Sequence, residues 1–157
     1  MRKLTAALLL GTALLFPGVA FAKDITVSID MTNYSGHAAY LAVYVTNPDG
    51  SYNSTLWVAG SKTKYMGHLR QWVQGIAASG TINIDGITGA SVGGGQNLTV
   101  NASLADTLID AGYEIHVDTA VENGGEYSSD VVVPLTQAAS GKPVDGTGYI
   151  SSMTVSL

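Results

Sequence analysis

The chain has 157 residues, of which 46% are apolar and only 12% are charged. That charged share is about half of the roughly 25% found in ordinary soluble domains. Cysteine is absent, which excludes disulfides, Cys-ligated zinc, iron–sulfur clusters and c-type haem attachment. Beyond the first 22 residues, five basic side chains stand against twelve acidic ones, a net charge of −7. A chain this acidic is not expected to bind nucleic acid or anionic membranes.

Residues 1–22 are predicted to be an export signal. Met1–Lys3 is a short basic start, Leu4–Phe16 is a mostly apolar run without charge, and Ala20–Ala22 has the small-x-small pattern of a cleavage site. The alternative is an uncleaved membrane anchor, but the apolar run is shorter than the roughly 20 residues of a comfortable span. We therefore expect residues 23–157 to form one soluble periplasmic domain that is not inserted in the membrane.

The mature chain is predicted to consist mainly of strands. Apolar and polar residues alternate with the period of two that marks a half-buried strand, and turn-forming Asn, Pro and Gly residues separate the runs. The predicted strands cover residues 25–31, 39–46, 54–59, 113–118, 128–135 and 149–157, the last of them at a sheet edge. This pattern predicts an all-β fold, an immunoglobulin-like β-sandwich of roughly seven to nine strands.

One segment departs from the strand pattern and predicts a short helix or helical turn. Its apolar residues have helical spacing: Tyr65, Leu69, Trp72, Val73 and Ile76. Gly75 is the predicted stop signal. The helix is expected to plug one end of the sandwich, and the alternative is an aromatic binding shelf.

Few residues form a pattern that indicates catalysis. The three histidines lack a nucleophile motif and an acid partner at a recognisable spacing. Glu114, His116 and Asp118 would share one strand face, either as a solvated stripe or as part of a metal site. Because they span roughly 13 Å of strand, a metal would need a ligand from another strand. No catalytic residue is predicted.

The most distinctive segment lies within a glycine-rich stretch. Half of residues 86–95 are glycine, so this stretch is predicted to be an exposed loop rather than a regular strand. Within residues 85–91, small residues flank two hydroxyl side chains. Such a segment fits an acceptor of covalent modification, which needs exposure, little bulk and backbone freedom. The alternative is a hairpin loop with incidental Thr and Ser.

Residues 85–91 resemble the acceptor motif of covalently flavinylated bacterial proteins. The family pattern is an Asp, a short spacer, and Ser/Thr-Gly-Ala-Ser/Thr. Asp85 matches the leading acid; Thr88, Gly89 and Ala90 match the core; Ser91 matches the attachment hydroxyl. The resemblance implies that a FAD:protein FMN transferase attaches FMN to Ser91 through a phosphodiester. Ser91 departs from the Thr of most acceptors but supplies the same oxygen nucleophile.

A second resemblance covers most of the mature chain. The order of its motifs is similar to that in an uncharacterised family of predicted periplasmic proteins, whose fold is like the Ig-like domain of flagellar hook-capping proteins. The matching positions are 40–45, Trp57, 64–65, Leu69, Trp72, 85–91, 112–115 and Glu122. This resemblance implies a Thr-Gly-Ala-Ser/Thr segment in mid-chain and neighbours that include membrane reductases and flavin transferases.

Two functions are therefore expected from the sequence. The favoured one is a periplasmic electron carrier with covalently attached FMN and without an enzymatic activity of its own. It would exchange electrons with a membrane-bound reductase or another periplasmic redox partner. Trp57, Tyr65 or Trp72 would then either stack on the flavin or lie in the core. The alternative is a non-redox Ig-like binding or structural module of the periplasm, with the possible metal stripe as its only chemistry.

Overall fold

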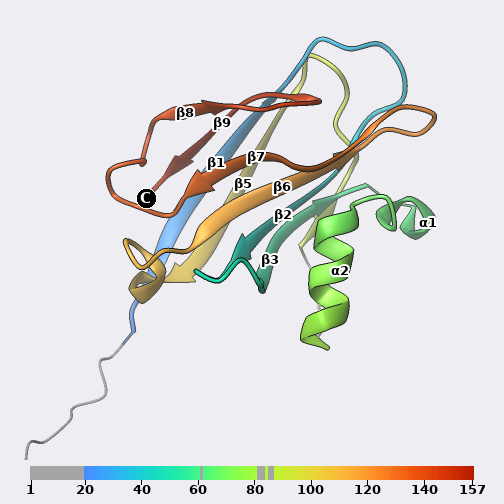
Figure 1. Cartoon of the computed structure of the whole chain (residues 1–157). Coiled ribbons are helices and arrows are strands. Elements are labelled where there is room, and N and C mark those ends of the chain that lie inside the picture. Colours follow the sequence, from blue (N-terminus) through green and yellow to red (C-terminus); the bar gives the residue numbers. More distant parts are fainter. Residues whose placement is uncertain (1–19, 61, 81–83, 85–86) are drawn as a thin grey trace, which may run out of the picture.

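The computed structural model describes residues 20–60, 62–80, 84 and 87–157, and within these the chain forms two β-sheets. Figure 1 shows the sheets packed face to face. The first sheet has, in spatial order, β5 (Asn97–Ala105), β1 (Ala22–Met31), β9 (Ile150–Ser156) and β8 (Pro143–Asp145). The second has β4 (Thr88–Gly89), β3 (Tyr52–Ala59), β2 (Tyr40–Thr46), β6 (Glu114–Ala120) and β7 (Glu126–Pro134). The predicted all-β sandwich is confirmed.

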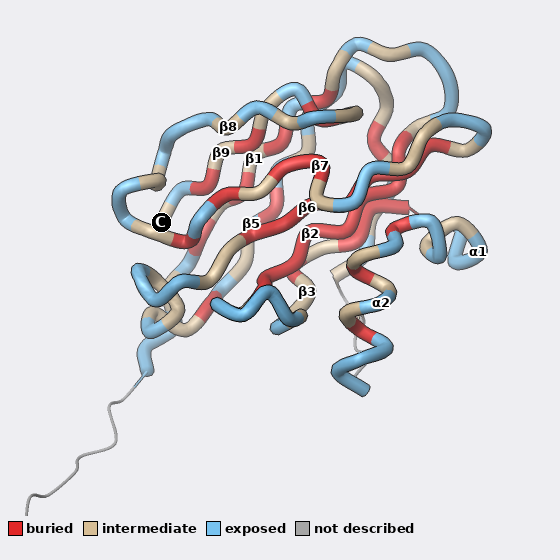
Figure 2. Tube along the Cα trace, viewed as in Figure 1, coloured by how far each residue is buried: buried red, intermediate tan, exposed pale blue. Residues whose placement is uncertain are grey.

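The core between the sheets follows from the alternation of apolar residues. In β1, Ile25, Val27 and Ile29 point inward and are at most 2% exposed. Every residue of β2 is buried, as the continuous red of this strand in Figure 2 shows. A strand buried on both faces needs a cover on its outer side as well as a core on its inner side.

That outer cover is a helix. α1 (Thr63–Met66) is a single turn, and α2 (Arg70–Ser79) runs over the outer face of β3, β6 and β7, as Figure 1 shows. A second apolar cluster, which includes Tyr44, Val58 and Trp72, joins α2 to the sheet. The expected plug at one end of the sandwich is therefore wrong, because the helix lies across a sheet face.

The helix also ends later than predicted. Gly80, with φ of +69°, is the C-terminal cap and donates its N–H to the Ile76 carbonyl. Gly75 lies inside α2, where an added Cβ would come 2.7 Å from Cβ of Tyr52. Gly75 thus permits the close approach of the helix to β3 instead of stopping the helix.

One further prediction about strands needs correction, and three elements were not predicted. The C-terminal strand β9 lies between β1 and β8 and is not at an edge. Strands β5 and β8 were not predicted, and neither was the short 3-10 helix Asp106–Leu108 that follows β5. β8 has only three residues and begins with a proline, so its sequence is too short to show the alternation of apolar and polar residues that predicts a strand.

Candidate functional site

The acceptor-like segment is attached to the edge of the second sheet. Within it, β4 pairs in parallel with β3, so that Thr88 lies beside Val58 and Gly89 beside Ala59. The N–H of Val58 donates to the Ile87 carbonyl at 2.8 Å. The expected free loop is therefore corrected for the described part of the segment: it begins as a short edge strand. Asp85 lies outside the described residues.

A second attachment follows directly after the segment. Ala39 and Val92 form an isolated antiparallel bridge, with N–H to carbonyl distances of 2.7 and 3.0 Å in the two directions. Further along, the position beside β2 belongs to β3: Leu41 pairs with Ala59, and the ring of Tyr40 lies against Gly60. The segment therefore meets β2 only where Ala39 precedes the strand, directly after Ser91.

The segment remains accessible between its two attachments. Thr88 and Ala90 are exposed, while Gly89 and Ser91 are half-buried. Ser91 therefore combines a fixed backbone position with partial exposure of its residue. A short, anchored segment with small neighbours is the arrangement that an acceptor hydroxyl requires when it must enter the active site of another protein.

Gly89 is required by its contact with an aromatic ring. A Cβ at this position would lie 2.5 Å from Cζ2 of Trp57, far inside the ordinary contact distance. Trp57 is half-buried against the inner core. The small residue of the motif thus allows β4 to lie directly over the indole ring.

We expect Gly89→Ala to destabilise the protein by about 1–3 kcal/mol, because the added methyl forces the Trp57 ring or β4 to move. Urea unfolding followed by tryptophan fluorescence measures the effect. Gly67→Ala is the matched control, because a Cβ at Gly67 meets nothing within 4 Å and its φ is −60°. Equal unfolding midpoints for the two variants would contradict the packing of β4 on Trp57.

Gly60 connects the segment to Tyr40. Its φ is +129°, and a Cβ there would lie 2.0 Å from Cδ1 of Tyr40. Its N–H donates to the Gly89 carbonyl at 2.8 Å. Gly60 is therefore needed both for its backbone conformation and for space, and it brings the tyrosine ring beside β4.

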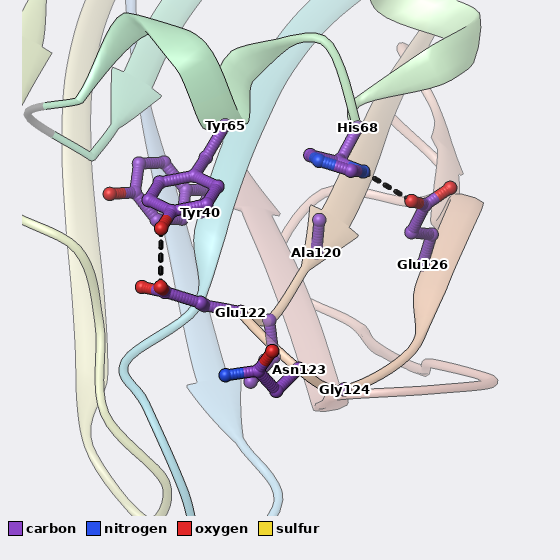
Figure 3. Close-up of a pocket in the computed structure, with 9 residues that line it drawn as sticks. Tyr40, Tyr65, His68, Ala120, Glu122, Asn123, Gly124 and Glu126 are labelled. Atoms are coloured by element: carbon purple, nitrogen blue, oxygen red, sulfur yellow. Dashed lines mark hydrogen bonds and ion pairs between the residues drawn. The ribbon is translucent and has the colours of Figure 1, made fainter.

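Tyr40 also forms one wall of a pocket of about 240 Å³. In Figure 3, Tyr40 and Tyr65 lie together on one side, and residues of the β6–β7 connection form the other. The ring centroids of the two tyrosines are 5.4 Å apart. The lining residues are Tyr40, Tyr65, His68, Ala120, Val121, Glu122, Asn123, Gly124 and Glu126.

Both carboxylates of the pocket have donors. The Tyr65 hydroxyl donates to Glu122, and this hydrogen bond is the main cause that lowers the pKa of Glu122. His68 and Arg70 both bond to Glu126, and these hydrogen bonds, His68 first, lower the pKa of Glu126. The pairs tie α1 and the start of α2 to the β6–β7 hairpin, as the dashed lines in Figure 3 show for Tyr65 and His68.

Because its pKa is lowered on folding, Glu126 contributes stability that is complete well above its ordinary pKa of 4.5 and is lost as the pH falls through the folded pKa. We therefore expect the urea midpoint to fall as the pH drops from about 6 to 3, and Glu126→Gln to flatten part of this decline. Asp24→Asn, at an exposed carboxylate of β1, is the control. A pH profile unchanged by Glu126→Gln would contradict the role of these pairs.

The pocket lies where the chain concentrates its positive charge. Of the five basic residues after residue 22, three fall in positions 62–70: Lys62, Lys64 and Arg70. The Nζ atoms of Lys64 and Lys62 lie 4.5 and 5.8 Å from the centroid of the Tyr65 ring. The hydrogen bond with Tyr65 raises the pKa of Lys64.

The three aromatic residues considered for flavin stacking have different environments. Trp72 is 3% exposed, and its Nε1 donates to Thr55 at 2.9 Å, so it is a core residue. Trp57 is half-buried beneath Gly89, and its Nε1 is buried with no hydrogen-bond partner among the residues that the structure describes. Tyr65 alone of the three lines the pocket.

The face of β6 that carries Glu114, His116 and Asp118 is not a solvated stripe, which was one of the two expectations for it. His116 is 9% exposed and Asp118 is fully buried, because α2 and β7 cover this side of β6. His116 bonds to Glu114 at 3.2 Å and to Ser129 at 2.8 Å, whereas Asp118 accepts from three other donors. Among the described residues, no group of three His, Asp or Glu residues has the geometry to hold a metal ion.

Sequence reasoning did not find the pocket, because its residues come from β2, α1, the segment before α2, and the β6–β7 connection. Tyr40 looked like an ordinary strand residue, and Glu122 lay in a turn. One signal was available: the clustering of the few basic residues at positions 62–70 in an otherwise acidic chain.

Residues 22–152 match the family described as predicted periplasmic protein (DUF2271). Since this match covers most of the chain, the protein belongs to that family. The expected periplasmic location agrees with the family's description, which assigns no activity. Comparisons with curated proteins and with solved structures gave no match. No helix in the described part of the chain is long and apolar enough to cross a membrane.

Proposed function

We propose that the protein is a periplasmic electron carrier with FMN attached to Ser91 through a phosphodiester. The observation that carries this proposal is the placement of residues 88–91. They comprise the edge strand β4 and the two residues after it, held before Ser91 by the pairing with β3 and after it by the bridge between Ala39 and Val92. A hydroxyl held in this way is presented to a modifying enzyme without unfolding of the domain.

The small residues before Ser91 support the attachment of a bulky group such as FMN at its hydroxyl. Gly89 and Ala90 leave the approach to Ser91 free of bulk, and neither Thr88 nor Ala90 is covered. The Ser91 hydroxyl attacks the FMN phosphorus of FAD, and the bond from that phosphorus to the bridging oxygen breaks. AMP leaves and the hydroxyl proton passes to solvent, so no oxidant or reductant is consumed. A divalent metal of the transferase would assist this step.

The bound flavin would supply the redox chemistry that the side chains lack. The chain has no cysteine, and its residues would position the cofactor and set its electrostatic surroundings. The expected partners are a FAD:protein FMN transferase, which loads the protein, and a membrane-bound reductase or another periplasmic redox protein. The net charge of −7 after residue 22 favours partners with basic surfaces, mainly through the rate of association.

The test is co-expression with a FAD:protein FMN transferase, followed by flavin fluorescence in a denaturing gel. We expect fluorescence in the wild type, in Thr88→Ala and in Ser91→Thr, because each keeps a hydroxyl at position 91. Ser91→Ala should show none. Fluorescence retained in Ser91→Ala but lost in Thr88→Ala would move the attachment to Thr88, and no fluorescence in any variant would overturn the function.

A non-redox binding module is the second candidate, and one observation favours it. β5 has nine residues and pairs only with β1, so its other edge carries no strand among the described residues. An open edge can accept an added strand from a partner. Proline at Thr99 should abolish partner binding under this function, whereas Ser91→Ala should leave it unchanged. The reverse result would exclude the binding module.

A further inference from the structure

A serine, a histidine and a glutamate form a connected row of side chains on the outer face of the second sheet. Oγ of Ser129 lies 2.8 Å from Nδ1 of His116, and Nε2 of His116 lies 3.2 Å from Oε2 of Glu114. Ser129 belongs to β7, whereas the other two residues belong to β6. A hydroxyl, an imidazole and a carboxylate in this order are the groups that activate an oxygen nucleophile.

The backbone of β7 is distorted at the point where it presents Ser129. The pairing of β6 with β7 shifts register between Val117 and Thr119. Residues 128–130 of β7 consequently lie opposite the single residue Asp118. Within this bulge Ser129 has φ of +47°, a conformation that is costly for a residue with a Cβ, and its N–H donates to Oδ1 of Asp118 at 2.8 Å. Bulges redirect side chains, and strained residues are concentrated at functional sites.

Glu114 determines which nitrogen of His116 is free to act as a base. An ionised carboxylate only accepts hydrogen bonds, so Nε2 of His116 carries the proton that faces Glu114. In a neutral imidazole the other nitrogen then has a lone pair, and this nitrogen, Nδ1, is the one beside the Ser129 hydroxyl. The ring of Tyr44 lies against the imidazole, with centroids 5.6 Å apart, and only 9% of His116 is exposed. The imidazole is therefore held in this orientation.

The Ser129 hydroxyl has a second neighbour, the carboxamide of Gln71 in the first turn of α2. Oγ of Ser129 donates to Oε1 of Gln71 at 2.7 Å. Rotation about the Cβ–Oγ bond turns the same proton to Nδ1 of His116, which lies at a similar distance. The carboxamide also has two N–H donors on its nitrogen. A donor beside the nucleophile is the group that stabilises the oxyanion formed in acyl transfer.

The row of side chains is partly exposed at the surface. Ser129 is half-buried, the neighbouring Ser128 is exposed, and 45% of the Glu114 side chain is exposed. Ser129 is not among the residues that line the pocket beside Tyr65, so a substrate would reach it from the surface and not from that pocket. A small carboxylic ester, whose carbonyl carbon is unhindered, fits such a site.

We propose that Ser129 is the nucleophile of an esterase site, with His116 as its general base and Glu114 as the residue that positions the imidazole. The Oγ proton passes to Nδ1 as Oγ bonds to the carbonyl carbon, and the alcohol leaves with that proton. Water then cleaves the acyl–serine ester, while His116 again takes and returns a proton. One ester and one water thus give one acid and one alcohol, and this activity does not depend on FMN at Ser91.

The first experiment treats the protein with a fluorophosphonate, which reacts with activated serine hydroxyls and releases fluoride. We expect one adduct in the intact mass, mapped to Ser129 by peptide mass spectrometry. Ser129→Gly should form none, and this variant should remain folded, because glycine adopts the φ of this position without strain. Ser128→Ala, at the adjacent exposed serine, is the matched control and should react as the wild type does.

The second experiment measures the hydrolysis of p-nitrophenyl acetate. His116→Asn should lower kcat at least about 100-fold, because the general base is lost. Glu114→Gln should lower kcat at least about tenfold and leave KM unchanged, because it alters the imidazole and not the binding of the ester. Far-UV circular dichroism checks the fold of each variant. The half-exposed side chain of Glu114 keeps the test decisive even where the buried His116 cannot be replaced without unfolding.

Two results would overturn the proposal. One is the absence of an adduct in folded wild-type protein, under conditions that label a known serine esterase completely. The other is an adduct at Ser129 that forms at the wild-type rate in folded Glu114→Gln, because the hydroxyl would then react without the imidazole that Glu114 positions. The proposed carrier function is tested separately: Ser91→Ala should keep the esterase activity, and Ser129→Gly should still be loaded by the transferase.

Discussion

Replacing Asp130 with alanine is expected to lower the free energy of unfolding by about 3–5 kcal/mol. The side chain is fully buried on β7. Its two oxygens accept from the Thr119 hydroxyl at 2.6 Å and from the four successive backbone N–H groups of residues 147–150 at 2.7 to 3.2 Å. Without the carboxylate, these donors of the β8–β9 turn lose their acceptor in a region that water enters poorly.

Urea unfolding followed by far-UV circular dichroism measures this loss. Asp145→Ala is the control, because Asp145 is an exposed residue of β8, and its substitution should change stability by less than about 0.5 kcal/mol. Asp130→Asn keeps one oxygen but turns an amide toward the donors, so it should fall between the two. A free energy of unfolding for Asp130→Ala within about 1 kcal/mol of the wild-type value would show that the carboxylate does not stabilise the turn that leads into β9.

Replacing Asp118 with alanine is expected to cost a similar amount, about 3–4 kcal/mol, and to loosen α2 from the sheet. Asp118 accepts from the Tyr44 hydroxyl at 3.0 Å and from the backbone N–H groups of Trp72 and Ser129 at 2.9 and 2.8 Å. Trp72 lies in the first turn of α2, where a carboxylate also complements the helix dipole. Burial raises the pKa of Tyr44, so its hydroxyl remains a donor throughout the accessible pH range.

This substitution has a local signature besides the loss of stability. Trp72 should gain solvent exposure, so the tryptophan emission of Asp118→Ala should shift to longer wavelength under native conditions. Asp24→Asn, at an exposed carboxylate of β1 in the other sheet, should leave emission and stability unchanged. A normal emission spectrum in Asp118→Ala would mean that packing alone, and not the carboxylate, seats the helix.

The sandwich was predictable because its signal is local. Alternating residues such as Val27 and Ile29 fix which face of β1 is buried, and the continuous apolar run of β2 indicated a central strand. The apolar residues of β5 also alternate, since Leu98, Val100 and Leu104 occur at even spacing. The glycine-rich stretch directly before this strand predicts a loop and obscures the alternation. The edge assignment of β9 failed because strand order depends on long-range pairing that no local pattern encodes.

The acidic strand shows why burial could not be predicted from one strand alone. His116 and Asp118 have the composition of a solvated face. They are buried because α2 crosses that face and because Asp118 replaces water with three protein donors. The helical spacing of Leu69, Trp72 and Ile76 predicted the helix, but not the surface on which it lies.

The candidate site was partly predictable for a related reason. Residues 85–91 are contiguous, so their motif could be recognised, whereas the adjacent pocket joins residues 40, 65 and 122, which are distant in sequence. The close approach of Gly60 to Tyr40 and of Gly89 to Trp57 explains why a larger residue would not fit at these two positions. This requirement could not be read from the sequence, because the aromatic partners are distant along the chain or on another strand.

The most direct test of the account is the intact mass of the mature protein, purified from the periplasm after co-expression with a FAD:protein FMN transferase. We predict a chain that begins at Lys23 and is heavier by one FMN less one water, with the increment absent in Ser91→Ala and present in Ser91→Thr. An unmodified mass in the wild type, under conditions where the transferase loads a known acceptor, would contradict the account.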